Sequence, residues 1–224
     1  MALRNWFAVL AIVVGVVGLY LDFSIIAGTV TASALNPVPR SLGNMLIYYW
    51  TFLTNVSNLG LLLVYLSDLT RWRWLGWFRQ PVTRGGMAGI MMLVMFFYHF
   101  MLAPNLPPVP QAITISNILL HYITPILFLV WWAVFCVHGA LRVRDVPVML
   151  VPGLSYVAYV LVRGLIAGEY PYTILDPNFA IQGQGAQGYL GVGIGVGILV
   201  VLVAIFDLLL TIIDGLIARR MKPA

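Results

Sequence analysis

The stretch YLGVGIGVGILVVLVAIFDLLLTIIDGLIA, residues 189–218, holds only two charged side chains, Asp207 and Asp214. A helix needs about 20 apolar residues to cross the hydrocarbon core of a membrane, and this stretch is longer than that. Earlier in the chain, further apolar stretches of comparable character cover residues 6–30, 43–66, 86–102, 115–137 and 146–167. The sequence therefore predicts an all-α fold, a polytopic integral membrane bundle of six transmembrane helices that forms a single domain over residues 1–224.

The composition also indicates a membrane protein. Of the 224 residues, 62% are hydrophobic and 8% are charged, whereas a soluble domain is about half apolar and about a quarter charged. The net charge of +5 would suggest nucleic acid in a soluble protein, but these basic residues lie in short segments between apolar runs. We therefore expect a lipid partner and no nucleic-acid partner. Cys136 is the only cysteine, which excludes an intramolecular disulfide and a cysteine-rich metal site.

Basic residues gather in alternate gaps between the apolar stretches. The basic gaps and ends hold Arg4, Arg71, Arg73, Arg79, Arg84, Arg142, Arg144, Arg219, Arg220 and Lys222. The other gaps hold Arg40 alone, no charge over residues 103–114, and the acids Glu169 and Asp176. Because cytoplasmic loops carry an excess of Lys and Arg, we predict a multi-pass protein of the plasma (inner) membrane with both termini in the cytoplasm.

Polar side chains inside the predicted helices recur every three or four residues, which places each set on one helix face. The first set comprises Thr51, Thr54, Asn55 and Asn58, the second Asn117, His121 and Thr124, and the third Tyr156, Tyr159 and Arg163. With the predicted topology, Thr51 lies ~12 Å and His121 ~9 Å below the outer ends of their helices. His99 and Asp22 fall at a similar depth. Because polar groups in a bilayer mark functional sites, these sets predict a polar cavity that opens toward the outer leaflet.

Several of these residues also have structural interpretations. A threonine in a membrane helix often bonds its own i−4 carbonyl, and asparagines can simply join helices. Arg163 could be the counter-ion of Asp22 or could extend to the outer surface, and Tyr170 and Tyr172 could be interfacial aromatics. His99, His121 and Asp22 together could bind a metal, although we expect no metal and no cofactor.

Three segments carry a resemblance to a known family. They are YYWTFLTN (residues 48–55), NILLHYITPILF (117–128), and YVAYVLVRG (156–164) with its continuation EYPY (169–172) and LD (175–176). In this order and spacing, the chain resembles the androgen-induced and androgen-dependent TFPI-regulating protein family, in particular its bacterial six-helix branch. Animal members of that family are membrane threonine hydrolases that cleave fatty acid esters of hydroxy fatty acids.

The resemblance implies that Thr51 is the nucleophile and His121 the base of a lipid ester hydrolase. Thr54 lies on the same helix face and remains a rival nucleophile. Two departures concern the substrate: Ile118 stands where animal members have a second histidine, and Trp131 stands where bacterial members often have aspartate.

Ester hydrolysis also requires hydrogen-bond donors for the developing oxyanion. Asn55, Tyr159 or His99 could supply them, and the guanidinium of Arg163 suits a substrate carboxylate. Asn58 and Asn117 are expected beside them in the cavity. The alternative function is a non-catalytic protein that binds or carries a lipid or small molecule in the same cavity, and the oligomeric state is left open.

Overall fold

The computed structural model describes residues 2–28, 40–106, 108–181 and 185–221. Five of its helical segments are long and apolar enough to cross a membrane, and a bent helix pair supplies a sixth. The single segments are Ala2–Ala27, Pro81–Asn105, Gln111–Phe135, Val143–Ala167 and Gly188–Met221, and the bent pair joins Leu42–Tyr49 to Leu53–Thr70. The prediction of an all-α bundle with membrane-length helices is confirmed at this level. Residues 29 and 30, predicted to end the first helix, lie outside the described residues.

The helices of these segments are α1 (Ala2–Ala27), α2 (Leu42–Tyr49), α3 (Leu53–Thr70), α4 (Pro81–Phe97), α5 (Gln111–Ile118), α6 (Thr124–Phe135), α7 (Val146–Ala167) and α8 (Gly188–Met221). Short 3₁₀ turns are η2 (Arg73–Arg79), η4 (Ala103–Asn105), η6 (Val143–Asp145) and η7 (Thr173–Leu175), and π-helical turns are η3 (Tyr98–Leu102) and η5 (Leu119–Ile123). An antiparallel pair of two-residue strands, β1 (Ala180–Ile181) and β2 (Gly185–Ala186), precedes α8.

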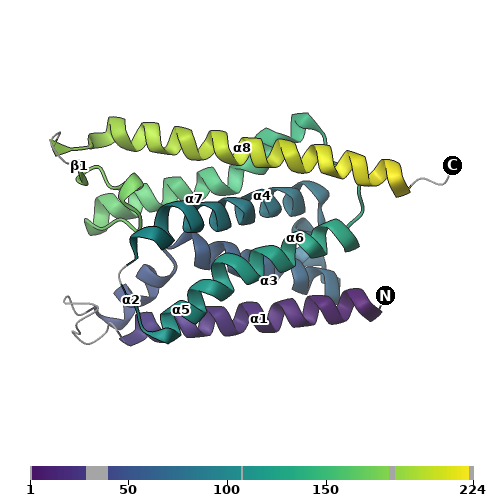
Figure 1. Ribbon diagram of the computed structural model, residues 1–224, viewed down its shortest axis with the longest axis horizontal. Coiled ribbons are helices and arrows are strands. Elements are labelled where there is room, and N and C mark those ends of the chain that lie inside the picture. Colours follow the sequence, from purple (N-terminus) through teal and green to yellow (C-terminus); the bar gives the residue numbers. More distant parts are fainter. Residues whose placement is uncertain (1, 29–39, 107, 182–184, 222–224) are drawn as a thin grey trace.

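Helix α4 lies at the centre of the bundle and contacts α3, α6, α7 and α8. Helix α1 packs on α3, α5 and α6, and α8 packs on α4 and α7 at the opposite side (Figure 1). The core between α3 and α6 is aromatic: the ring of Tyr65 meets those of Phe128 and Trp131 edge-on at centroid distances of 5.8 and 5.2 Å. The outer faces of the helices are apolar as well, with Ile166 83% and Leu190 79% exposed. So much exposed apolar surface is typical of contact with lipid.

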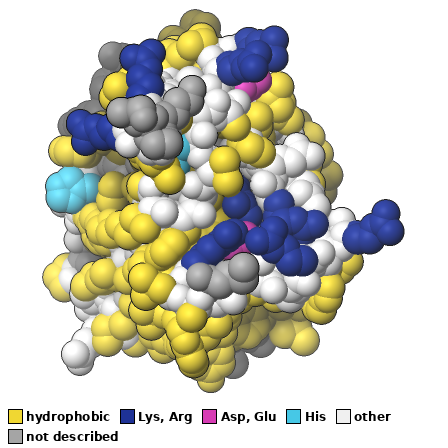
Figure 2. Space-filling model, turned by 90° about the vertical axis from the view of Figure 1, so that its right-hand side faces the viewer, with side chains coloured by type: hydrophobic (Ala, Val, Ile, Leu, Met, Phe, Trp, Pro, Cys, Tyr) yellow, Lys and Arg dark blue, Asp and Glu magenta, His cyan; other side chains and the backbone are white. Residues whose placement is uncertain are grey.

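Both termini lie at the same end of the bundle (Figure 1). Viewed from that end, arginine side chains surround acidic ones (Figure 2). Asp68 of α3 is buried and pairs with Arg4 and Arg84. Arg84 was predicted to lie between two helices, but it is inside α4 and buried, because the carboxylate of Asp68 compensates its charge.

The second predicted helix, residues 43–66, is not continuous. The chain bends by 72° between α2 and α3, where Phe52 is extended with ψ 130°. A membrane-embedded break must satisfy the backbone groups it releases, and two tyrosines from distant segments do so. The Tyr156 hydroxyl donates to the Thr51 carbonyl at 2.8 Å, and the Leu53 N–H donates to the Tyr172 hydroxyl at 3.2 Å.

The two π-helical turns follow from proline. Pro125 comes two residues after η5, and Pro104 comes two residues after η3. Neither proline has an N–H to donate to the carbonyl four residues earlier, which disturbs the regular α-helical ladder. Such π-turns are frequent at functional sites, and these two meet, because the ring of Tyr98 in η3 stacks on that of His121 in η5.

Candidate active site

A threonine and a histidine from different helices face each other inside the bundle. The Thr54 Oγ1 lies 3.0 Å from the His121 Nε2. Thr54 is the second residue of α3 and directly follows the bend, and His121 lies in the π-turn η5. A hydroxyl within hydrogen-bond distance of an imidazole is the arrangement that activates an oxygen nucleophile.

The contact made by the Nδ1 atom of His121 determines which of the two ring nitrogens carries the hydrogen. Its Nδ1 lies 3.0 Å from the carbonyl oxygen of Asn117, and a carbonyl can only accept. In the neutral ring, Nδ1 therefore carries the hydrogen and Nε2 is the acceptor. Nε2 is thus free to take the proton of Thr54, as a general base must.

Two neighbours hold this pair in place. The Tyr98 ring stacks on the imidazole of His121 with centroids 3.9 Å apart and planes at 20°. The Asn58 amide donates to the carbonyl of Thr54 at 2.8 Å and to that of Leu120 at 3.2 Å. Because Asn58 is almost fully buried and bonds to both backbones, it connects the turn that carries Thr54 to the turn that carries His121.

The pair lies between two cavities of different character. Among the described residues, those that line both cavities are Thr54, Tyr98, Leu102, His121 and Tyr172. A substrate that reaches the pair can therefore extend to both sides of it.

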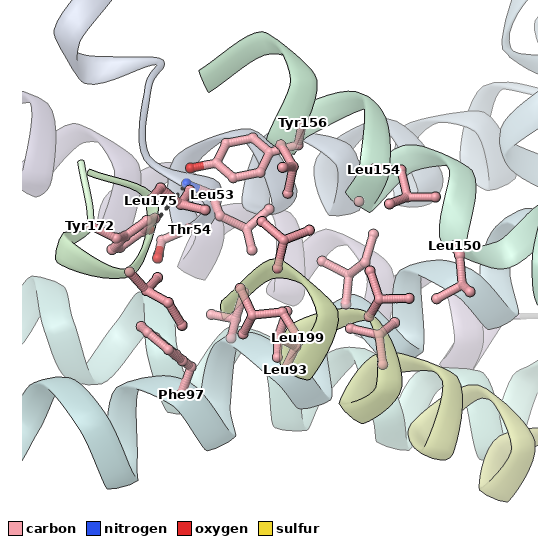
Figure 3. A pocket seen from close by; sticks show the side chains of 18 of the residues that line it. Leu53, Thr54, Leu93, Phe97, Leu150, Leu154, Tyr156, Tyr172, Leu175 and Leu199 are labelled. Atoms are coloured by element: carbon pink, nitrogen blue, oxygen red, sulfur yellow. Dashed lines mark hydrogen bonds between the residues drawn. The ribbon is translucent and has the colours of Figure 1, made fainter. Parts of the chain in front are cut away.

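The first cavity is apolar and runs between α4, α7 and α8. Figure 3 shows the hydroxyl-bearing residues Thr54, Tyr156 and Tyr172 at one end of it. Leu150 and Leu154 lie at the other end, and Leu154 is 44% exposed. The cavity thus reaches the apolar outer face of the bundle, where a hydrocarbon chain can enter from the side. We call it the apolar cavity.

The second cavity, which we call the polar cavity, lies between α1, α3 and η5 and has a volume of about 260 Å³. Asp22, Asn55 and Asn117 line it, together with Phe52 and several aliphatic side chains. The Asn55 amide donates to the Asp22 carboxyl at 2.9 Å and to the Tyr49 carbonyl at 3.0 Å. This volume holds several water molecules or the alcohol part of an ester.

Tyr172 supplies a hydroxyl beside the threonine. Its hydroxyl accepts from the Leu53 N–H and interacts with the side chains of Thr54 and Tyr156. Because the Leu53 N–H is a donor, the proton of this hydroxyl points to a different partner, which can be a neighbouring hydroxyl or the oxygen of a ligand in the cavity. The amino end of α3, with its positive dipole end, lies at the same point, so the surroundings of Thr54 favour a developing negative charge.

The other predicted nucleophile, Thr51, lies in the bend. Its Oγ1 donates to the Ile47 carbonyl one turn earlier at 2.8 Å, and it lines neither cavity. The structure thus brings His121 to Thr54 rather than to Thr51. Thr51 contributes its backbone carbonyl, which accepts from Tyr156.

The remaining predicted site residues divide into two groups. Asn55 and Asn117 line the polar cavity, whereas Asn58, His99, Tyr159 and Arg163 line neither of the two cavities. His99 is exposed and bonds the Tyr122 hydroxyl at 3.0 Å, and Tyr159 is 41% exposed. Arg163 pairs with Glu169 at 2.9 Å rather than with Asp22.

Sequence reasoning missed Tyr98 and Tyr172 as site residues. For Tyr172 the sequence left an interfacial position open, and the EYPY segment of the family resemblance was the available signal for a site role. Tyr98 had no signal, because its position depends on the π-turn. Within the described ranges, no three His, Cys, Asp or Glu side chains come together as metal ligands would.

Gly164 of α7 supports the loop that positions Tyr172. A Cβ added at Gly164 would collide with the ring of Tyr170. We expect Gly164→Ala to displace this loop, with a loss of about 1–3 kcal/mol in stability. Thermal unfolding in detergent measures this loss. Gly197→Ala on α8, where an added Cβ meets no atom within 4 Å, is the control, and equal losses in both variants would contradict the prediction.

No protein-family model, curated protein or solved structure matches this chain. The resemblance carried by residues 48–55, 117–128 and 156–176 therefore stays a prediction about the family. What the chain can do is inferred from the side chains around Thr54 and His121.

Proposed function

We propose that this protein is a membrane-embedded threonine hydrolase that cleaves lipid esters, with Thr54 as nucleophile and His121 as general base. The observation that carries the proposal is the 3.0 Å contact between Thr54 Oγ1 and His121 Nε2 at the junction of an apolar and a polar cavity. Lipid esters, of which fatty acid esters of hydroxy fatty acids are one class, have a hydrocarbon chain for the first cavity and an ester that reaches the junction.

The proposed reaction has two halves. Thr54 Oγ1 bonds to the ester carbonyl carbon while His121 Nε2 takes its proton, and the tetrahedral oxyanion collapses with cleavage of the bond to the alcohol oxygen. His121 gives its proton to the leaving alcohol. Water then attacks the acyl-threonine with His121 again as base, which releases the fatty acid and restores Thr54.

The proposal includes the orientation in the membrane. The end of the bundle with both termini is arginine-rich (Figure 2), which favours a cytoplasmic position for it under the positive-inside rule. We place the chain in the inner membrane as a six-helix protein. The Thr54–His121 pair then lies toward the outer leaflet, and the apolar cavity opens to lipid.

The deciding experiment is covalent labelling of the purified protein with a fluorophosphonate probe. We expect one adduct per chain, located on Thr54 by peptide mass spectrometry, and loss of labelling in His121→Ala. An adduct elsewhere, or full labelling of His121→Ala, would contradict the proposal. A protein that takes no label and cleaves no lipid ester, yet co-purifies with a lipid, would instead be a non-catalytic lipid-binding protein.

The Tyr172 hydroxyl is the oxyanion donor in this proposal. Tyr172→Phe should lower kcat about 10²–10³-fold, because it removes one donor that acts in the transition state. KM should change little. Steady-state kinetics on a soluble ester measure the effect, with Tyr159→Phe on the exposed face of α7 as the control. If kcat is unchanged in a Tyr172→Phe protein of normal melting temperature, Tyr172 is not the donor.

A further inference from the structure

The polar cavity contains a carboxyl group that the proposed reaction does not use. Asp22 of α1 lines this cavity beside Thr54 and His121. Its Oδ2 accepts a hydrogen bond from the amide of Asn55 at 2.9 Å, and no second bond to this carboxyl group is found within the described part of the chain. A carboxyl group accepts several hydrogen bonds, and the polar cavity that Asp22 lines has room for a group that donates them. Asp22 therefore favours a ligand that brings hydrogen-bond donors.

The polar cavity is lined by an acidic side chain, Asp22. No arginine or lysine is among the described residues that line it. Arg40, just before α2, and Arg163, near the end of α7, both pair with Glu169. A substrate carboxylate in the polar cavity would thus face Asp22 without a described cation to compensate it, and like charges brought together oppose binding.

The two parts of an ester substrate would occupy different cavities. The apolar cavity suits the acyl chain, so the alcohol part lies in the polar cavity, next to Asp22 and Asn55. We propose that the preferred substrate is the fatty acyl ester of a neutral polyhydroxylic alcohol such as glycerol, whose free hydroxyls donate to Asp22. This inference rests on the proposed hydrolase function and selects a substrate class for it. It also disfavours esters whose alcohol part bears a carboxylate, as hydroxy fatty acids do.

The test compares kcat/KM of the full-length protein in nanodiscs for esters that share one acyl chain. The alcohol parts are glycerol, methanol, choline and a hydroxy fatty acid. For the wild type we expect the glycerol ester to exceed the methyl ester by about tenfold or more, as a hydrogen bond to a charged group implies, and to exceed the other two esters as well.

Asp22 variants then attribute this preference to the carboxyl group. Asp22→Ala should bring the ratio of glycerol to methyl ester close to one, and Asp22→Asn should raise the relative rate for the hydroxy fatty acid ester. Asp176→Asn is the matched control, since Asp176 is an acid of the loop before α8 that lines neither cavity, and its ratios should equal those of the wild type.

Particular outcomes overturn the inference. The inference fails on the wild type alone if the methyl, choline or hydroxy fatty acid ester is cleaved best. The inference also fails if the kcat/KM ratios between the esters are unchanged in both Asp22 variants. If cleavage still depends on Thr54 in that case, the hydrolase proposal itself remains valid. If Thr54→Ala cleaves all four esters at the wild-type rate, the proposed function fails and the substrate inference fails with it.

Discussion

Thr54→Ala should lower kcat for ester cleavage about 10⁴-fold or more, which is the range seen when a catalytic nucleophile is removed. The reason is that the attacking oxygen is lost, while both cavities and His121 remain. Thr54 is only one oxygen and one methyl group larger than alanine, so the fold should tolerate the change. Single-turnover hydrolysis of a chromogenic acyl ester, together with a melting curve in detergent, measures both.

Thr51→Ala is the matched control for this variant. Thr51 lies three residues earlier on the chain, but its hydroxyl bonds the carbonyl of Ile47 and does not contact His121. We expect kcat within about threefold of the wild type, because a side-chain bond of this kind contributes only about 1 kcal/mol to stability and nothing to the reaction. The opposite result, in which Thr51→Ala cleaves no ester while Thr54→Ala remains active, would identify Thr51 as the nucleophile.

Asp214→Ala should destabilise the protein by about 3 kcal/mol, because it leaves hydrogen-bond donors that the carboxylate now satisfies without their acceptor. Asp214 of α8 is buried and accepts from the side chain of His138 at 2.8 Å. Its second oxygen accepts from the backbone N–H groups of Gly139 and Leu141 at 2.8 and 3.0 Å. One carboxylate thus joins α8 to the turn between α6 and η6, and its loss leaves the buried His138 side chain and the buried Leu141 N–H without this acceptor.

The apparent melting temperature in detergent is the measurement for Asp214→Ala. The control is Asp145→Ala in the neighbouring turn η6, where the carboxylate accepts from the exposed Arg142 N–H at 2.9 Å. Because water can replace that bond, we expect a loss of about 1 kcal/mol or less. Equal melting temperatures for the two variants would show that the Asp214 network does not stabilise the bundle.

The long apolar segments were predictable because their physical cause is local. Helix α8, for example, contains an 18-residue window with a mean hydropathy of 3.0, and a membrane helix satisfies its own backbone hydrogen bonds. The boundaries shifted where charges are compensated by distant partners. Arg84 looked like a loop residue, but a carboxylate on α3 allows it to lie inside α4.

The site was predictable in part for the same reason. Asn117 and His121 are four residues apart and therefore share one helix face, and both line the polar cavity together with Thr54 and Asn55. Tyr98 and Tyr172 could not be assigned from spacing, because their roles depend on a π-turn and on a loop that folds back onto the bundle. Asn58 joins two helical segments, which is the structural interpretation that the sequence also allowed for it.

The sequence by itself determined the helical, membrane-type architecture and the set of polar side chains that it has to bury, since hydrophobicity and helical periodicity are properties of the chain alone. Only the tertiary structure decided which threonine meets the histidine. The bend between α2 and α3 directs Thr51 to its own helical turn and Thr54 to His121. That bend exists because Tyr156 and Tyr172, more than a hundred residues away along the chain, bond the backbone groups that the bend releases, and no pattern within residues 43–66 contains those partners.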